Sequence, residues 1–372
     1  MRVGLDYRPV TCAPQCGIGR QVKALQEALD ARADIQLRLF SEAPLDHPQR
    51  HQAFCPPWAS PLNGLHRPHV RLRFEGRFLP RVLRQTRIQL YIATANMGLP
   101  LGPKPADICY ALLLHDLFQL TEHNRHRSGY VAWAYRLLDR LSIGYSVWRA
   151  DRIWTPSGFT AAELKRLFPW AAGKVRVLPN RVVDFTATEA QPDGLALPER
   201  FWLAVGTREP RKNMARFVAA WCQARQSSAA VPELVLVGSA TDLPVDLRQR
   251  PGLHFRQHLS EGQLKALYQA SERLWHPSYA EGFGLPVVEA LSLGIPVAVA
   301  RGSALEEVAP PATPRFDPHD SARMSLLMAQ LAAHRQVESR QQLRQWASQY
   351  SEPAYRNRLQ TLLAEPMSCP WV

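Results

Sequence analysis

Short apolar runs recur along the chain and alternate with longer segments in which apolar residues return every three or four positions. Runs of this kind, bounded by Gly, Pro and polar residues, are typical of buried parallel strands, whereas the longer spacing is typical of helices. The strand-like runs lie at residues 2–5, 35–40, 88–93, 108–114, 152–155, 175–179, 201–205, 234–238, 253–255, 274–276 and 295–300. The alternation predicts an α/β protein with parallel sheets.

The predicted helices follow the strand-like runs. They lie at residues 22–29, 129–150, 214 onward, 261–271 and 321–365, and one more begins near 157, where Ser157 and Thr160 are alternative N-caps. The length of 372 residues points to two domains. Residues 181–199 lack periodicity and are rich in Ala, Pro, Asp and Thr, as an interdomain linker would be. We therefore expect domains over residues 1–182 and 200–350.

The segment 276–297, HPSYAEGFGLPVVEALSLGIPV, predicts a loop, a short helix and a buried strand. Pro286 suits the first turn of a helix, and Gly294 suits its end. The helix begins just after two glycines, so its free amides and positive dipole end favour a phosphate group. Glu281 in the loop and Glu289 in the helix frame this anion site.

Polar side chains follow three other predicted strands. Arg208, Arg211 and Lys212 come after the strand at 201–205 and before a helix, where cations can neutralise a diphosphate. His115 ends the strand at 108–114, at the edge of the sheet where open α/β folds bind ligands. Gly17-Ile18-Gly19-Arg20 predicts a glycine turn between strand and helix, but it lacks the third glycine of a dinucleotide fingerprint.

The patterns EGFGLPxxEALxxGxPV at 281–297, VGTREPRKN at 205–213 and HDL at 115–117 resemble those of the family 4 glycosyltransferases. The resemblance implies the GT-B fold, with two Rossmann-like domains facing across a cleft and a C-terminal helix, here 351–372, that crosses back to the first domain. Two positions depart from the family pattern. Thr207 follows Gly206 where some relatives carry Arg, and Ala309-Pro310-Pro311 replaces the usual Gly-Asp-Ala.

The resemblance also implies roles for individual residues. Glu281 and His115 would position the donor sugar, Arg211 and Lys212 would hold the diphosphate, and Glu289 would bind the ribose hydroxyls. The implied catalytic residues are Glu281, His115, Lys212 and Arg211. The implied donor-binding residues are Gly17, Gly19, Arg208, Arg211, Lys212, Gly282, Phe283, Gly284, Leu285 and Glu289.

The implied reaction is transfer of a hexose, with retention, from a nucleotide-diphosphate sugar to a hydroxyl group. The donor is predicted to be GDP-mannose and the acceptor a lipid-linked oligosaccharide or polysaccharide of a bacterial surface. No D-x-D motif occurs in the chain, so neither a metal nor another cofactor is expected, and fixed cations would stabilise the leaving group. Alternatives are another GT-B enzyme, such as a nucleotide-sugar epimerase or a phosphorylase, and a non-catalytic sugar-binding module.

The charge is strongly basic and unevenly distributed. The chain has a net charge of +13, and residues 1–200 hold 27 Lys and Arg against 17 Asp and Glu. Nucleic acid is one partner that such charge attracts, but no nucleic-acid-binding motif occurs, so we do not expect it. In residues 66–87, arginines alternate with Phe, Leu and Val, which is typical either of a helix lying on an anionic membrane or of a solvated helix face.

The remaining composition favours a cytosolic protein. The six cysteines are scattered and form no paired C-x-x-C framework, as expected for reduced thiols. The first residues, MRVGLDYRPV, do not resemble a signal peptide, and no apolar run approaches the length of a membrane span. We therefore expect a cytoplasmic protein bound peripherally to the inner face of the cell membrane.

Overall fold

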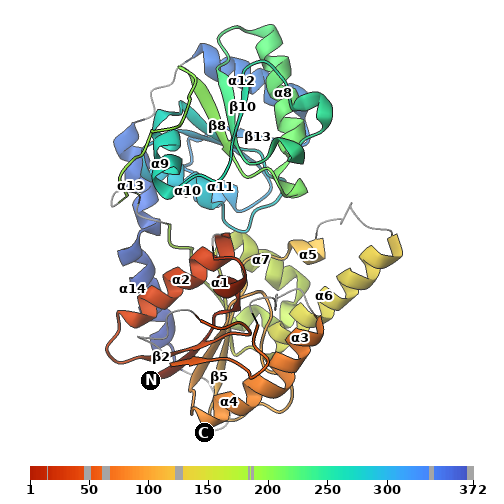
Figure 1. The fold of residues 1–372 in the computed structure, drawn as a ribbon, viewed down its shortest axis with the longest axis vertical. Helices are drawn as coiled ribbons and strands as arrows, with labels where there is room; N and C mark the ends of the chain where they lie inside the picture. The colour runs from red at the N-terminus through yellow and green to blue at the C-terminus, as the bar shows by residue number, and fades with distance from the viewer. Residues whose placement is uncertain are drawn as a thin grey trace. The chain divides into compact units, whose positions relative to one another are not determined.

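The computed structural model describes residues 1–366 except 15, 46–51, 61–67, 122–128, 183–184, 186–187 and 335–338. The chain divides into two compact units, one of Met1–Arg181 with Tyr355–Val372 and one of Val182–Ala354. Each unit is an α/β domain with its own parallel sheet, which confirms the predicted fold class (Figure 1). Val182 and Phe185, in the predicted linker, are buried in the core of the second unit.

The sheet of the first unit has the order β3-β2-β1-β4-β5-β6-β7, and every neighbouring pair is parallel. Its strands are β1 (Arg2–Asp6), β2 (Gln36–Phe40), β3 (Gln52–Phe54), β4 (Leu90–Ala93), β5 (Cys109–Leu113), β6 (Arg152–Thr155) and β7 (Val175–Val177). The edge strand β3 is not among the strands that the sequence predicted. It is three residues long and none of its residues is fully buried, so it has no apolar signature.

Helices cover this sheet, and α14 comes from the far end of the chain. They are α1 (Arg8–Cys12), α2 (Gly17–Asp30), α3 (Pro68–Arg73), α4 (Leu79–Gln85), α5 (Phe118–Thr121), α6 (Gly129–Arg149), α7 (Gly158–Leu167) and α14 (Glu352–Ala364). Tyr355, Leu359 and Leu362 of α14 pack in the same core as Val3 and Leu5 of β1. The predicted return of the C-terminal helix to the first domain is therefore present.

Two local predictions are settled at the starts of α7 and α2. Ser157 is the N-cap of α7, because its hydroxyl oxygen accepts a hydrogen bond from the backbone N–H of Thr160. Gly17 and Gly19, predicted to form a turn before the helix, lie instead in the first turn of α2. A Cβ atom on Gly19 would come within 2.4 Å of the carbonyl oxygen of Ala13, so the close approach of these segments requires glycine.

The arginine-rich segment forms α3, a π-helical turn at Phe74–Phe78 and α4, and Arg67 lies outside the described residues. The apolar side chains that would enter a bilayer are largely used in the core: Val70, Phe74, Leu79 and Leu83 are buried. The described part of this segment therefore packs most of its apolar side chains in the core and exposes mainly its arginines.

The sheet of the second unit has the order β10-β9-β8-β11-β12-β13 and is also parallel throughout. Its strands are β8 (Phe201–Val205), β9 (Glu233–Val237), β10 (Leu253–Arg256), β11 (Arg273–His276), β12 (Val297–Ala300) and β13 (Arg315–Phe316). Its helices are α8 (Met214–Ser227), α9 (Glu261–Ala270), α10 (Leu285–Ser292), α11 (Leu305–Val308), α12 (Ser321–Ala333) and α13 (Arg340–Ala347).

The strand order reverses once in each sheet, between β1 and β4 and between β8 and β11. At such a reversal the loops at the carboxyl ends of the two strands diverge and leave a crevice in which open α/β sheets bind ligands. The predicted site residues follow these strands and β5. In the part of the chain that the structure describes, no helix combines the length and apolar character needed to cross a membrane.

Candidate functional site

The main candidate site lies in the second unit, in the loops that follow β8 and β11. The two strands are hydrogen-bonded neighbours, with Arg273 opposite Trp202 and Leu274 opposite Leu203. The basic loop 206–213 leaves β8, and the glycine loop 277–284 leaves β11. The reversal of strand order thus brings together two predicted motifs that are about 70 residues apart in sequence.

Glu281 is the centre of this site. Its side chain is almost completely buried, and one oxygen, Oε1, lies 2.6 Å from Nζ of Lys212. The other oxygen, Oε2, lies 2.8 Å from a guanidinium nitrogen of Arg211. Ser278 donates a hydrogen bond of 2.9 Å to Oε1, and Nε2 of His276 lies 3.1 Å from the same atom. Two cations and two neutral donors therefore surround one carboxylate.

The charges of this cluster reinforce one another. Burial alone would raise the pKa of Glu281, but Lys212, the hydrogen bond from His276 and Arg211 together hold it well below its usual range. Burial would also lower the pKa of Arg211, yet Glu281 and Glu209 hold it above its usual value. Burial lowers the pKa of His276, so its ring is neutral and Nε2 carries the proton that faces Glu281.

Backbone contacts fix the basic loop against the glycine loop. The N–H of Tyr279 donates to the carbonyl oxygen of Arg211 at 2.8 Å, and the guanidinium of Arg211 donates to the carbonyl oxygen of Ala280 at 3.1 Å. The side chain of Asn213 donates to the carbonyl oxygens of Pro277 and Pro318. Asn213 adopts a left-handed conformation, which asparagine tolerates better than most residues. The two cations are therefore held in place.

The glycine loop leads directly into α10. Gly284 precedes the helix with φ of 100°, and a Cβ atom there would come within 2.5 Å of Leu305, so both backbone and space require glycine. Gly282 and Phe283 are buried, and Leu285 is half-buried at the first position of α10. Phe283 packs edge-on against Tyr350. The predicted loop and helix are thus both present, with their glycine positions defined by geometry.

Glu289 lies one turn further along α10 and is almost fully buried. Its Oε2 accepts a hydrogen bond of 2.9 Å from the hydroxyl of Tyr268, on α9. Arg208, by contrast, is exposed, and the structure records no hydrogen bond or ion pair between it and any residue that it describes. The cluster that the fold assembles thus contains Arg211 and Lys212 without Arg208.

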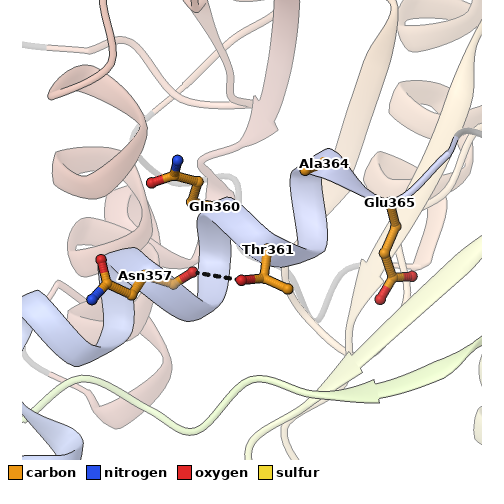
Figure 2. Close-up of a pocket in the computed structure, with 5 residues that line it drawn as sticks. All are labelled: Asn357, Gln360, Thr361, Ala364 and Glu365. Atoms are coloured by element: carbon orange, nitrogen blue, oxygen red, sulfur yellow. Dashed lines mark hydrogen bonds between the residues drawn. The ribbon is translucent and has the colours of Figure 1, made fainter.

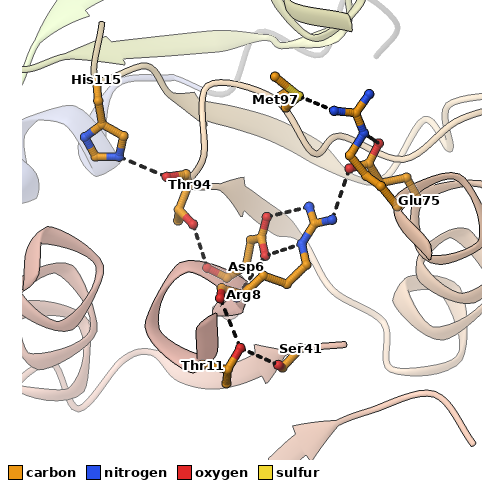
Figure 3. A network of polar contacts seen from close by, with 9 residues as sticks. Asp6, Arg8, Thr11, Ser41, Glu75, Thr94, Met97 and His115 are labelled. Atoms are coloured by element: carbon orange, nitrogen blue, oxygen red, sulfur yellow. Dashed lines mark hydrogen bonds and ion pairs between the residues drawn. The ribbon is translucent and has the colours of Figure 1, made fainter. Parts of the chain in front are cut away.

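In the first unit, His115 follows β5 and is buried (Figure 3). Its Nε2 lies 2.9 Å from the carbonyl oxygen of Thr94, and its backbone N–H donates to the side chain of Asn96. A carbonyl oxygen can only accept, so Nε2 carries the proton and the other ring nitrogen is an acceptor. Burial lowers the pKa of His115 to about 4, against an opposing effect of the Thr94 hydrogen bond, and the ring is therefore neutral near pH 7.

A buried ion network lies beneath this histidine. The hydroxyl of Thr94 donates to the carbonyl oxygen of Asp6, whose carboxylate accepts two hydrogen bonds of 2.8 Å from Arg8. Arg8 also pairs with Glu75 at 3.1 Å (Figure 3). Asp6 and Arg8 are essentially inaccessible, so the network fixes the ends of β1 and β4. Gly17 and Gly19 belong to the same unit and lie on α2.

Sequence reasoning missed three residues that contact the predicted site: His276, Ser278 and Tyr268. His276 and Ser278 had a signal, since both lie within the quoted loop segment and precede Glu281 by five and three positions. Tyr268 had none, because it lies in the helix predicted at 261–271, outside the quoted loop segment. A surface pocket on α14, lined by Asn357, Gln360, Thr361, Ala364 and Glu365, contains none of the predicted site residues (Figure 2).

Comparison with protein families gives two adjacent matches. The model described as Glycosyltransferase Family 4 matches residues 16–183, and that described as Glycosyl transferases group 1 matches residues 186–349. Among curated proteins, the chain is 28% identical over 193 residues to O-antigen chain mannosyltransferase B of Escherichia coli. The aligned region covers 48% of this chain and 51% of that protein.

A second relative, O-antigen chain mannosyltransferase RfbU of Salmonella typhimurium, is 27% identical over 174 residues, or 45% of this chain and 47% of that protein. The chain therefore spans about half the length of these curated relatives. Among solved structures, a sucrose-phosphate synthase from Thermosynechococcus elongatus aligns with a TM-score of 0.74 at 18% identity over 98% of both chains. Anabaena HepE in complex with UDP-glucose aligns with a TM-score of 0.66 at 15% identity over 98% of this chain and 100% of that one.

Proposed function

We propose that the chain, which belongs to the family 4 glycosyltransferases, transfers a hexose with retention from a nucleotide-diphosphate sugar. The observation that carries the proposal is the cluster of Arg211, Lys212 and Glu281 at the reversal of strand order between β8 and β11. Two cations held in place at that point suit a diphosphate, since they need not reorganise as its charge develops.

The roles of the site residues follow from their positions. Arg211 and Lys212 would bind the donor diphosphate and stabilise it as it leaves, a role that a metal ion would otherwise have. Glu281 keeps both cations oriented, and it would share them with the diphosphate while contacting the sugar. Glu289, held by Tyr268, would accept the ribose hydroxyls. The leaving phosphate would then take the proton of the acceptor hydroxyl on the same face of the sugar.

His115 fits the same reaction as a neutral group. Its protonated nitrogen is directed to Thr94, so the remaining ring nitrogen would accept a hydrogen bond from a sugar hydroxyl. By the family resemblance, Gly17 and Gly19 in the first turn of α2 would belong to the donor site.

Mannose from GDP-mannose is the proposed donor, and a lipid-linked saccharide of a bacterial surface polymer is the proposed acceptor. The support is the similarity to two O-antigen chain mannosyltransferases, one of Escherichia coli and one of Salmonella typhimurium. An enzyme with this acceptor would work peripherally at the cytoplasmic face of the membrane.

The test is to incubate the purified protein with GDP-mannose, UDP-glucose and other nucleotide sugars, with and without bacterial lipid-linked saccharides. The proposal predicts release of nucleoside diphosphate and a lengthened saccharide only when both substrates are present. Conversion of the donor into an epimeric nucleotide sugar in the absence of acceptor would indicate an epimerase. A sugar phosphate formed with inorganic phosphate would indicate a phosphorylase, and binding without turnover a non-catalytic module.

A further inference from the structure

Exposed apolar side chains are concentrated on α6. Of the ten large apolar residues recorded as exposed in the described part of the chain, five lie on this helix. They form what we call the α6 ridge: Trp133, Leu137, Leu138, Leu141 and Trp148. Four of them, at 133, 137, 141 and 148, have the spacing of a single helix face. Ile143 and Val147 on the other side are fully buried in the core, so the ridge is a second apolar face.

An apolar face of this size on a helix surface needs a partner, because soluble proteins rarely expose several large apolar side chains together. The identity of the residues narrows the choice. Trp133 and Trp148 lie towards the two ends of the ridge with leucines between them, and tryptophan is the residue most typical of the boundary between lipid and water.

The charged residues around the ridge further restrict the kind of partner that it can bind. The sequence of α6 contains three arginines and one acid, Asp139. Arg140 is exposed between Leu137 and Leu141. The neighbouring helix α3 is joined to α6 by a hydrogen bond of 2.8 Å from Arg71 to Ser142. Arg73 and Arg77, later in the same segment, are exposed, and the guanidinium of Arg73 lies over the ring of Trp58. Cations beside a large apolar face favour a surface that is both apolar and anionic.

We propose that the α6 ridge, flanked by these arginines, docks the protein onto an anionic lipid bilayer. The helix would lie in the interface, because it is not apolar enough to cross the membrane. A second copy of the chain is a poorer partner, since a twofold interface would bring the same arginines together. The proposed function enters this inference at one point only: membrane docking would hold the enzyme where a lipid-linked acceptor is embedded.

The proposal divides the predicted membrane contact between two segments. Exposed arginines of the segment 66–87 would supply charge, and α6 would supply the apolar side chains. Two groups of residues would thus contribute separately to membrane binding. The contribution of the ridge does not depend on headgroup charge. The contribution of Arg73, Arg77 and Arg140 depends on anionic lipid and falls with salt.

The experiment measures cosedimentation of the full chain with phosphatidylcholine vesicles, with and without phosphatidylglycerol. Leu141→Gln is compared with Leu326→Gln on α12, because the two leucines are 62% and 63% exposed and either change should leave folding intact. Leu141→Gln should weaken vesicle binding about tenfold, and Leu326→Gln should leave it unchanged. Replacing Arg73 and Arg77 by Gln should weaken binding about fivefold per arginine, on anionic vesicles alone.

Equal binding of wild type and Leu141→Gln, or no binding by wild type, would overturn the proposal. Light scattering that shows a dimer of the wild type and a monomer of Leu141→Gln would also overturn the proposal, because the ridge would then be an interface between two copies of the chain. Vesicle binding requires neither donor nor acceptor, so it is independent of the proposed function. Sugar transfer without vesicle binding would contradict the docking surface but not the proposed function. Vesicle binding without sugar transfer would contradict the proposed function but not the docking surface.

Discussion

Replacing Glu281 by Gln tests the central ion cluster most severely. The substitution keeps the size of the side chain and removes the charge that lies 2.6 Å from Lys212 and 2.8 Å from Arg211. Both cations would remain largely buried without their common counterion. Removing one partner of a buried ion pair costs about 3–5 kcal/mol. For a unit of this size, 1 kcal/mol shifts the melting temperature by about 2–4 °C, so we expect a fall of about 6–20 °C.

The matched control is Glu289→Gln. Glu289 is even more deeply buried and lies on α10 just beyond the same loop, but it accepts a hydrogen bond from the neutral hydroxyl of Tyr268. Glutamine still accepts that hydrogen bond, so we expect a loss of about 1 kcal/mol. Thermal unfolding followed by circular dichroism measures both variants. Equal stability losses in the two variants would refute the reasoning, because charge would then not matter at Glu281.

The stability of Glu281→Gln can also be measured with added nucleoside diphosphate and at acid pH. A diphosphate should stabilise Glu281→Gln more than wild type, since it replaces the missing negative charge beside Arg211 and Lys212. The pKa of Glu281 is lower in the folded protein than in the unfolded chain, so its stabilisation is complete above about pH 5 and lost as pH falls further. The acid slope of stability should therefore be shallower in Glu281→Gln than in wild type.

Three other predictions follow from the site. Lys212→Ala should lower turnover about 100- to 1000-fold in the transfer assay, and normal turnover would contradict the role of Lys212 on the leaving group. Tyr268→Phe should weaken nucleotide binding about fivefold in calorimetry with little change in turnover, because it removes the hydrogen bond from the Tyr268 hydroxyl to Glu289; unchanged affinity would show that this hydrogen bond does not position Glu289 for the nucleotide. Because burial lowers the pKa of His115 to about 4, the unfolded chain is protonated first, and stability should fall as pH drops from about 6.5 towards that value. His115→Gln should flatten this slope in pH-dependent denaturation, and an unchanged slope would place the titration elsewhere.

The sequence predicted most of the fold because buried parallel strands leave a strong apolar signature. β6 and β8 have the predicted bounds, and β1, β5 and β12 differ only at their ends. The strands it missed, β3 and β13, are edge strands of three and two residues. Such strands bury little and have no pattern to detect. Gly17 and Gly19 were misplaced because a glycine pair signals a turn equally well inside the first turn of a helix.

The candidate site was predictable where it depended on motifs and not where it depended on side-chain partners. The pairing of Arg211 and Lys212 with Glu281 needs the adjacency of β8 and β11, which sequence spacing alone does not give. The burial of Phe74 and Leu79 likewise depends on which helix face meets the sheet. The exposed ridge of α6 could not be distinguished from a buried face by its periodicity, because that helix has apolar residues on both faces.

The most direct test of the account compares how a nucleoside diphosphate and the matching nucleoside bind to the wild-type chain. If Arg211 and Lys212 form the diphosphate site, the diphosphate should bind far more tightly, its affinity should fall with salt, and Lys212→Ala should remove most of the difference. Equal affinity for nucleoside and nucleoside diphosphate would contradict the account, because the cluster around Glu281 would then serve the stability of the fold and not the donor.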